Sequence, residues 1–236
     1  MKLPLSKRLA ACCRFIDNCR CVADIGCDHG YLGIYLLKNA ITDSIIAADI
    51  HQQPLNTACH NAHKYGVADK MRFYLSDGAA QIPRDFDTMV CAGMGADTII
   101  SILSASPWLK STQYTLILQC QSKAPALRRF LAEEGYCIED EVVLRDGRFL
   151  YTVMKVRYHS GHTPAEAEYY FPTVMLSHPS EATAMYYRRV CSSLTRIINC
   201  RKEVDPWTLN VLTQVKALAD DPANYWLLEV KHGNGK

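Results

Sequence analysis

Short, continuous apolar runs recur between residues 21 and 157, and segments with apolar residues at helical spacing lie between them. Continuous apolar runs are typical of strands buried on both faces, and intervening helices indicate βαβ units. The runs predict strands at 21–25, 44–49, 71–75, 87–92 and 114–119, and helices at 31–38, 54–65, 97–103 and 125–134. The chain is therefore expected to form a parallel sheet covered by helices on both faces.

The pattern changes at residues 136–158. Two β-rich runs, 136–144 and 149–158, flank Arg145-Asp146-Gly147, and Asp-Gly is a strong hairpin signal. A parallel sheet that finishes in an antiparallel hairpin is typical of the α/β, Rossmann-like class I methyltransferase fold rather than of a dehydrogenase. A fold supports a function only by analogy, so the chemistry must come from particular residues.

Strand signals stop after about residue 160, and helical spacing then dominates. The range 180–204 predicts one long helix, and Asp205-Pro206 predicts the start of a second helix that continues through Leu218. Two helices joined by a tight turn predict an antiparallel, coiled-coil-like hairpin. We therefore expect two domains, a Rossmann-like domain at 1–160 and a C-terminal α-helical hairpin domain at 161–236.

Composition restricts the classes of protein that remain. The 236 residues are 49% hydrophobic, and 26 basic residues against 24 acidic ones give a net charge of +2, so any nucleic-acid site must be a local patch. No apolar run approaches the roughly 18 residues that span a bilayer. The N-terminal charges precede no apolar signal-peptide region. We expect a cytoplasmic, monomeric protein without a membrane partner.

Eleven cysteines are present, five of them between residues 12 and 27. Such a cluster raises the question of zinc or an iron–sulfur centre, but no C-x-x-C pair occurs. We expect reduced thiols that serve as small core residues, and no metal.

The segment 22–32, VADIGCDHGYL, combines a strand, a glycine turn and the start of a helix. Gly26 would let the backbone approach a bound nucleotide closely. Asp28 stands where a dinucleotide-binding loop can carry its third glycine, and its charge would repel a pyrophosphate. S-adenosylmethionine has no phosphate and carries cationic amino and sulfonium groups, which Asp24 and Asp28 suit. The alternative is an ordinary turn with solvated carboxylates.

Two further acids follow predicted strands. Asp49 ends the second strand, where an acid can accept both ribose hydroxyls, and Asp77 follows the third, where one can hold the adenine amino group. The fourth strand ends in a glycine loop with Met94, which can pack on a base. Because parallel strands end at one edge of the sheet, these groups should converge on adenosylmethionine. The predicted cofactor residues are Asp24, Gly26, Asp28, Asp49, Ile50, Asp77, Gly78, Ala92, Gly93 and Met94.

Four segments, at 5–9 (LSKRL), 23–32 (ADIGCDHGYL), 92–95 (AGMG) and 116–119 (LILQ), resemble the bacterial tRNA adenine-22 N1-methyltransferases. The resemblance runs in order along nearly the whole chain. It implies a Rossmann-like catalytic domain, adenosylmethionine as methyl donor, and transfer to N1 of the adenine at tRNA position 22. The chain departs from the family at Gln121, where relatives carry Asn, and at Asp49, where relatives often carry Glu.

Basic residues suggest where tRNA would bind. Residues 1–20 carry five basic residues against one acidic residue, and three more cations follow the fifth strand. Such side chains could neutralise tRNA phosphates, although solvated helix faces are the alternative for each of them. The predicted RNA-binding residues are Lys7, Arg8, Arg14, Lys123, Arg128 and Arg129.

Catalysis at N1 requires no strong base, because the ring nitrogen already carries a lone pair. The methylated adenine is cationic, and a nearby carboxylate would stabilise that charge as it develops. Asp28 is the candidate, with His29 orienting it or accepting the N6 proton later; alternatively, both residues only shape the cofactor loop. The competing functions are a methyltransferase acting on another RNA site or a small molecule, and a non-catalytic RNA-binding protein that retains a cofactor pocket.

Overall fold

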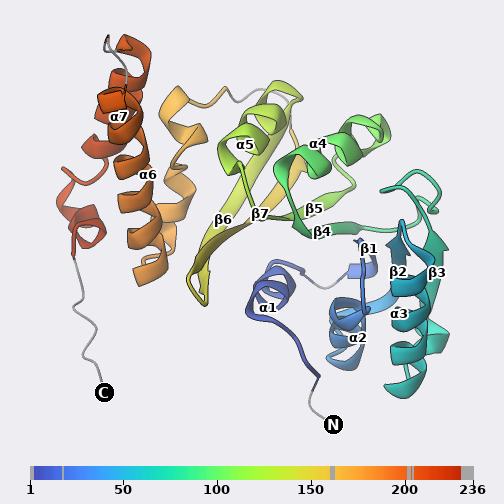
Figure 1. Cartoon of the computed structure of the whole chain (residues 1–236). Coiled ribbons are helices and arrows are strands. Elements are labelled where there is room, and N and C mark those ends of the chain that lie inside the picture. The colour runs from blue at the N-terminus through green and yellow to red at the C-terminus, as the bar shows by residue number, and fades with distance from the viewer. Residues whose placement is uncertain (1–2, 18, 160–162, 201–202, 204, 230–236) are drawn as a thin grey trace, which may run out of the picture.

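A seven-stranded mixed sheet forms the centre of the molecule (Figure 1). The computed structural model describes residues 3–17, 19–159, 163–200, 203 and 205–229. The strand order is β3-β2-β1-β4-β5-β7-β6; the first five strands are parallel, and β7 lies antiparallel to both β5 and β6. The predicted Rossmann-like methyltransferase architecture is therefore confirmed.

The boundaries of most elements lie close to those predicted. The strands are β1 (Cys19–Ile25), β2 (Thr42–Asp49), β3 (Met71–Leu75), β4 (Thr88–Met94), β5 (Thr115–Cys120), β6 (Tyr136–Asp146) and β7 (Phe149–Tyr158). The α-helices are α1 (Lys7–Arg14), α2 (Tyr31–Lys38), α3 (Gln52–Lys64), α4 (Ala96–Ser104), α5 (Ala124–Glu133), α6 (Glu181–Cys200) and α7 (Pro206–Ala217). The 3-10 helices are η1 (Ala68–Lys70), η2 (Pro107–Leu109), η3 (Glu166–Tyr169), η4 (Thr173–Ser177) and η5 (Pro222–Leu227). The end of the helix predicted to reach 204 lies outside the described residues.

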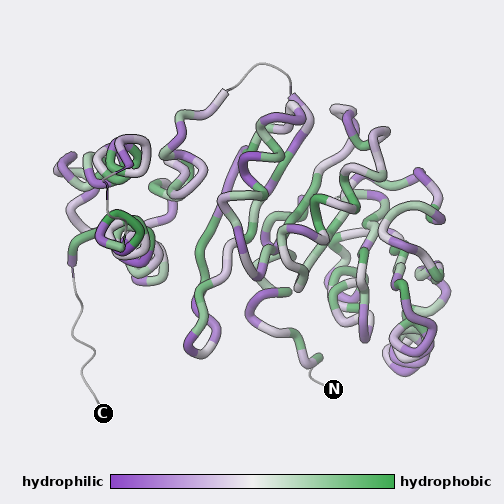
Figure 2. The backbone as a smooth tube through the Cα atoms, turned by 45° about the horizontal axis from the view of Figure 1, so that its top comes forward, coloured by the Kyte–Doolittle hydropathy of each residue, from purple (hydrophilic) through white to green (hydrophobic). Residues whose placement is uncertain are grey.

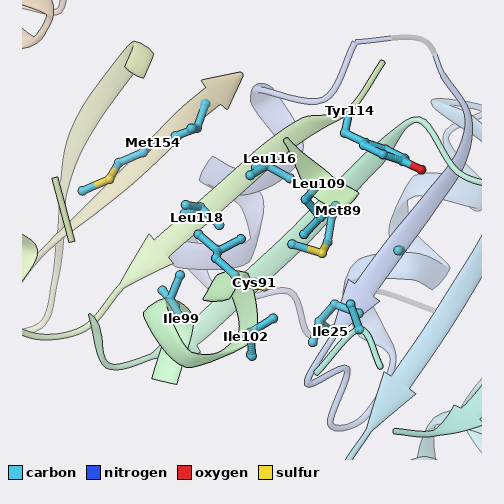
Figure 3. Close-up of a cluster of buried hydrophobic side chains, with 14 of the residues drawn as sticks. Ile25, Met89, Cys91, Ile99, Ile102, Leu109, Tyr114, Leu116, Leu118 and Met154 are labelled. Carbon is cyan, nitrogen blue, oxygen red and sulfur yellow. The ribbon is translucent and has the colours of Figure 1, made fainter. Parts of the chain in front are cut away.

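The sheet separates two hydrophobic layers. Consecutive strand residues point to opposite faces, so Met89 and Leu116 pack with α4 and α5, whereas Val90 and Ile117 pack with α1, α2 and α3. Figure 3 shows the first layer, in which Met89 and Leu116 lie among side chains of neighbouring strands and of α4. Burial on both faces explains why the central strands are continuously apolar in the sequence.

The C-terminal helices form a third core beside the β6–β7 hairpin (Figure 1). Tyr187 and Leu194 of α6 pack with Val211 and Val215 of α7, and Val143 of β6 joins them. Figure 2 shows hydrophobic and hydrophilic stretches alternating along these helices, as expected of amphipathic helices. The predicted domain boundary at 160/161 falls outside the described residues.

A buried ion pair between Arg128 and Glu141 lies where the helical part packs against the sheet. The Arg128 guanidinium, on α5, donates to both carboxylate oxygens of Glu141 on β6 (3.0 and 2.7 Å), to the carbonyl of Tyr169 (2.8 Å) and to the hydroxyl of Tyr186 on α6 (3.1 Å). Arg128 is 2% exposed. The prediction that Arg128 binds RNA is therefore wrong, because its charge is already satisfied inside the protein.

The cysteines serve largely as core residues. All eleven are free thiols, and Cys12, Cys13, Cys21 and Cys27 of the N-terminal cluster are buried. Within the described ranges, no group of three or more His, Cys, Asp or Glu side chains is arranged to hold a metal ion. Nor does any helix in that part of the chain combine the length and hydropathy of a membrane span.

Candidate functional site

A cavity of about 470 Å³ opens at the carboxyl edge of the sheet, beside the ends of β1, β2 and β4. Its volume lies within the range of small-molecule sites. The structure brings together here most of the predicted cofactor and catalytic residues: Asp24, Gly26, Asp28, His29, Asp49, Ile50, Ala92, Gly93 and Met94. The convergence of acids from separate strands is what the parallel topology requires.

The loop after β1 brings its backbone close to this cavity. Gly26 and Gly30 both have φ of +72°, and Asp28 between them has φ of +49°. The positive φ of Gly26 favours glycine, because other residues are strained in that conformation, and a Cβ atom there would also displace the end of the Met94 side chain. The amides of Gly26 and Cys27 both donate to the carbonyl of Ala48 (2.8 and 2.9 Å), which ties the loop to the end of β2.

Asp49 joins this loop to the start of α3. Its Oδ2 accepts from the amide of Asp28 (3.2 Å), and its Oδ1 accepts from the amide of His51 (2.9 Å). A carboxylate has about four lone-pair positions, so capacity for a ligand hydroxyl remains. Asp49 therefore stabilises the turn and also lines the cavity, and its contact with a cofactor stays a prediction.

Asp24 is the most deeply placed acid of the site, 4% exposed. Burial, followed by the nearby charges of Asp49 and Asp28, raises the pKa of Asp24 to about 7. Three carboxylates thus surround one cavity, and their mutual repulsion would be relieved by a cationic ligand. With three acids against the one guanidinium of Arg8 in the lining, this electrostatic arrangement favours an amino or sulfonium group over a phosphate.

Asp28 and His29 lie at the exposed mouth of the cavity. Their side chains are 70% and 52% exposed, and His29 Nε2 lies 3.7 Å from Asp28 Oδ1. The two side chains therefore lie close together in a position that a second substrate can reach, and the role of His29 in orienting Asp28 stays a prediction.

Gln119 is a cavity residue that the sequence reasoning did not single out. It is fully buried at the end of β5, and its Oε1 accepts from the amide of Gly93 (2.9 Å). Its Nε2 has no hydrogen-bond partner among the described residues. Gln121 also lines the cavity, and its backbone N–H donates to the carbonyl of Met94 (2.8 Å). The LILQ motif at 116–119 was the available signal for Gln119.

Two predicted cofactor residues, Asp77 and Gly78, of which Asp77 was expected to hold the adenine amino group, are not among the residues lining the cavity. Asp77 is exposed, and its backbone amide donates to Oε1 of Gln81 (2.8 Å). Gly78 packs against Ile102. A contact between Asp77 and a cofactor stays a prediction.

The predicted RNA-binding cations occupy different environments. Arg8 lines the cavity, and its guanidinium lies 5.0 Å from the ring centre of Tyr151. Lys123 is 63% exposed and pairs with Asp97 (2.7 Å).

Lys123 and the remaining cations are not among the residues that line the cavity. Arg129 pairs with Glu166 (2.6 Å), and Arg14 lines a separate cavity that also contains Asp17. Lys7 is exposed on α1. Arg8 is therefore the predicted RNA-binding cation that lines the cavity, and contacts of the others with RNA stay predictions.

The sheet order, the glycine loop and the acid-lined cavity together define a Rossmann-like methyltransferase. A family described as "Methyltransferase domain" matches residues 5–154, and the chain belongs to this family.

Within this family, the chain is similar to proteins described as tRNA methyltransferases. The tRNA (adenine(22)-N(1))-methyltransferase of Bacillus subtilis is 34% identical over 154 residues, which span 65% of this chain and 65% of that protein. A putative tRNA methyltransferase of Mycoplasma pneumoniae is 29% identical over 205 residues, or 81% of this chain and 90% of the relative. These matches agree with the resemblance seen in the sequence motifs.

Solved structures extend the likeness to the helical part. M. capricolum TrmK, in complex with S-adenosyl-homocysteine, has a TM-score of 0.74 at 26% identity, covering 94% of this chain and 97% of that one. A putative tRNA (m1A22) methyltransferase of Streptococcus pneumoniae has a TM-score of 0.78 at 24% identity, covering 95% and 100% of the two chains. The fold is therefore shared over nearly the whole length.

Proposed function

We propose that this protein methylates N1 of the adenine at position 22 of tRNA, using S-adenosylmethionine. The observation that carries the proposal is the cavity in which Asp24, Asp28 and Asp49 converge at the carboxyl edge of a methyltransferase sheet. The similarity to the Bacillus subtilis enzyme supports the choice of base and position.

The cavity residues fit the cofactor by their chemistry. Asp49 is placed to accept the ribose hydroxyls, and Asp24 offers a carboxylate to the cationic amino acid portion. Ile50 is 55% exposed at the cavity and, with Met94, offers apolar surface to an adenine ring. Bound adenosylmethionine supplies an electrophilic methyl group.

The substrate adenine must be unpaired or turned out of its helix to present N1, at a cost of a few kcal/mol. The N1 lone pair then forms the new bond to the methyl carbon, while the carbon–sulfur bond breaks and its electron pair stays on sulfur. The adenine gains the positive charge, so no proton needs to leave beforehand. Asp28 at the cavity mouth stabilises this charge, and His29 orients Asp28 or accepts the N6 proton later.

The proposed tRNA contacts are the five predicted cations that are exposed or half-buried. Lys7 and Arg8 of α1 and Lys123 at the start of α5 meet phosphates near the cavity, and Arg14 and Arg129 extend the basic surface.

The direct test is methyl transfer to tRNA transcripts in vitro, with digestion and identification of the methylated nucleoside. We expect 1-methyladenosine from a transcript with adenine at position 22 and none when that adenine is replaced by guanine. Methyl transfer to another position, or only to a small molecule, would favour the alternative enzyme. Cofactor and tRNA binding without transfer would favour the non-catalytic alternative.

Asp28→Asn tests the catalytic assignment. We expect the single-turnover rate to fall by about tenfold, because the neutral amide stabilises the developing cation less well. Affinities for adenosylmethionine and tRNA should remain near those of the unmodified protein. If cofactor affinity falls in step with the rate, Asp28 is a cofactor residue, and catalysis rests mainly on positioning.

A further inference from the structure

A second cavity, of about 580 Å³, lies between the start of α5, strand β7 and helix α6. We call it the β7–α6 groove. Its walls include Lys123, Phe149, Tyr151, Tyr170, Tyr186 and Arg189. Lys123 was predicted to bind RNA, but the sequence patterns did not single out the others.

The groove presents aromatic rings to solvent. Phe149 is 49% exposed, and its ring centre lies 6.2 Å from that of Tyr151. The Arg148 guanidinium lies 5.0 Å from the Phe149 ring centre. Exposed aromatic rings beside arginines are the surfaces on which unpaired bases stack.

The charge of the groove is complementary to a phosphate backbone. Lys123 and Arg189, both exposed, stand on opposite walls, one at the start of α5 and the other on α6. Among the described residues that line the groove, none is acidic. Lys123 pairs with Asp97 (2.7 Å), which is not a lining residue, so a phosphate between these walls would meet Arg189 and would compete with Asp97 for Lys123.

The groove adjoins the cofactor cavity. Gln121 lines both cavities, and Arg8 of the cofactor cavity lies over the ring of Tyr151 in the groove. A target base that enters the cofactor cavity must leave its neighbouring nucleotides near this junction, because the backbone connects them.

The floor of the groove holds an unused polar group. Thr152 is 2% exposed and lines the groove, and its Oγ1 has no hydrogen-bond partner among the described residues. Buried hydroxyls normally have partners. A base edge or a ribose 2′-hydroxyl could supply one.

We propose that the β7–α6 groove binds a nucleotide that flanks the methylated adenine, with its base stacked on Phe149 and Tyr151 and its phosphate between Lys123 and Arg189. This inference rests on the proposed function, because it requires an RNA substrate. The helical part of the chain thereby supplies one wall of the substrate site.

The first test compares groove variants with matched controls elsewhere. Phe149→Ala should weaken tRNA binding about tenfold, in line with the loss of one stacked base. Arg189→Ala should weaken it and lower the slope of the salt dependence by about one. Tyr225→Ala, at a 54% exposed aromatic on η5, and Lys64→Ala, at the exposed end of α3, should change neither quantity. Adenosylmethionine affinity, measured by calorimetry, should remain unchanged in all four variants.

The second test pairs the protein change with a change in the RNA. Transcripts that lack the base on one side or the other of the target adenine are titrated against the unmodified protein and Phe149→Ala. Loss of the base at one of the two positions should weaken binding to the unmodified protein about tenfold and should hardly change binding to Phe149→Ala. Equal costs in both proteins, at both positions, would overturn the proposal.

The outcomes separate this proposal from the proposed function. If the unmodified protein transfers no methyl group to tRNA, the proposed function fails, and the groove assignment fails with it. If transfer occurs and the groove variants behave as the controls do, only the groove assignment fails. A change in sedimentation of Phe149→Ala with unaltered tRNA binding would instead show that the groove joins two copies of the chain.

Discussion

Two buried carboxylates, Asp24 at the carboxyl edge of the sheet and Glu141 beneath the C-terminal helices, differ in what surrounds them. Glu141 is fully buried and receives two hydrogen bonds from Arg128. Asp24 is 4% exposed, and its charged neighbours are Asp49 and Asp28, which raise its pKa further beyond the effect of burial. Glu141 thus has a cation as its ion-pair partner, whereas Asp24 has none among the residues that the structure describes.

The difference separates structural charge from functional charge. Burying an ion is costly unless a partner compensates it, so Arg128 and Glu141 depend on each other. Burial lowers the pKa of Arg128, but Glu141 and the Tyr186 hydroxyl outweigh that effect and raise it above its ordinary value. Asp24 has no ion-pair partner among the described residues, so a cationic ligand could supply the compensating charge, and such buried acids indicate functional sites.

The largest expected effect is on cofactor affinity, when Asp49 of the acid-lined cavity is changed in Asp49→Ala. Adenosylmethionine affinity should fall by about 10²–10⁴-fold, because two ribose hydroxyls would lose a charged acceptor worth about 1.5–3 kcal/mol per hydrogen bond. Calorimetric titration measures this loss.

Because Asp49 also accepts from the amides of Asp28 and His51, thermal unfolding of the same variant is the control. Asp49→Asn keeps the size of the side chain and one acceptor oxygen. A large loss of stability with unaltered cofactor affinity would make Asp49 a turn-forming residue only.

The next largest effect is expected on stability, when the buried ion pair of Arg128 and Glu141 is broken in Arg128→Met. Removal of the guanidinium leaves Glu141 buried and uncompensated, which should lower the free energy of unfolding by about 3–5 kcal/mol. Arg129→Ala is the matched control, because its pair with Glu166 is about two-fifths exposed and should contribute about 0–1 kcal/mol. Urea denaturation compares them; equal losses would show that burial does not distinguish the two pairs.

A smaller effect concerns the pH dependence of Asp24. In the folded protein its pKa is raised from 3.8 to about 7, so between these values the folded state binds a proton that the unfolded state lacks. This contribution to stability is therefore fully present below pH 3.8 and is lost as pH rises towards 7. Asp24→Asn should raise the free energy of unfolding by about 2–4 kcal/mol at pH 8 and progressively less towards pH 5. Unfolding titrations across this range would contradict the assignment if the gain were independent of pH.

The affinity for the ligand should depend on pH in the opposite direction to the stability. The charged carboxylate attracts the cationic cofactor, so adenosylmethionine affinity should weaken as pH falls from 7.5 to 6, a range in which the ligand's amino group stays largely protonated. In Asp24→Asn this dependence should disappear.

The sequence predicted the sheet and the cofactor cavity for one physical reason. Strands buried on both faces are continuously apolar, and parallel strands end at one edge, so Asp24 and Asp49 had to converge once the strands were recognised. Helix α1 was not predicted: it has only eight residues, it is polar on average, and its buried residues are the small Ala11, Cys12 and Cys13.

Partners distant in the sequence could not be predicted in the same way. Arg128 and Arg129 are adjacent and look equivalent in the sequence. Only Arg128 is buried, where it donates hydrogen bonds to Glu141 and to the carbonyl of Tyr169. Phe149 and Arg189 lie 40 positions apart and come together only through the packing of α6 beside the β6–β7 hairpin. Local periodicity carries no information about such pairings.

The smallest expected effect is that of Asp77→Ala. Asp77 is exposed and is not among the residues lining the cavity, so a contact with the adenine amino group would be solvent-screened and worth about 0.5–1.5 kcal/mol. Adenosylmethionine affinity should fall by no more than about tenfold, far less than in Asp49→Ala. Calorimetry of both variants with adenosylmethionine, and with an analogue that lacks the amino group, checks this order. A loss in Asp77→Ala that persists with the analogue would mean that the substitution acts through the loop after β3, since the amino group would then play no part.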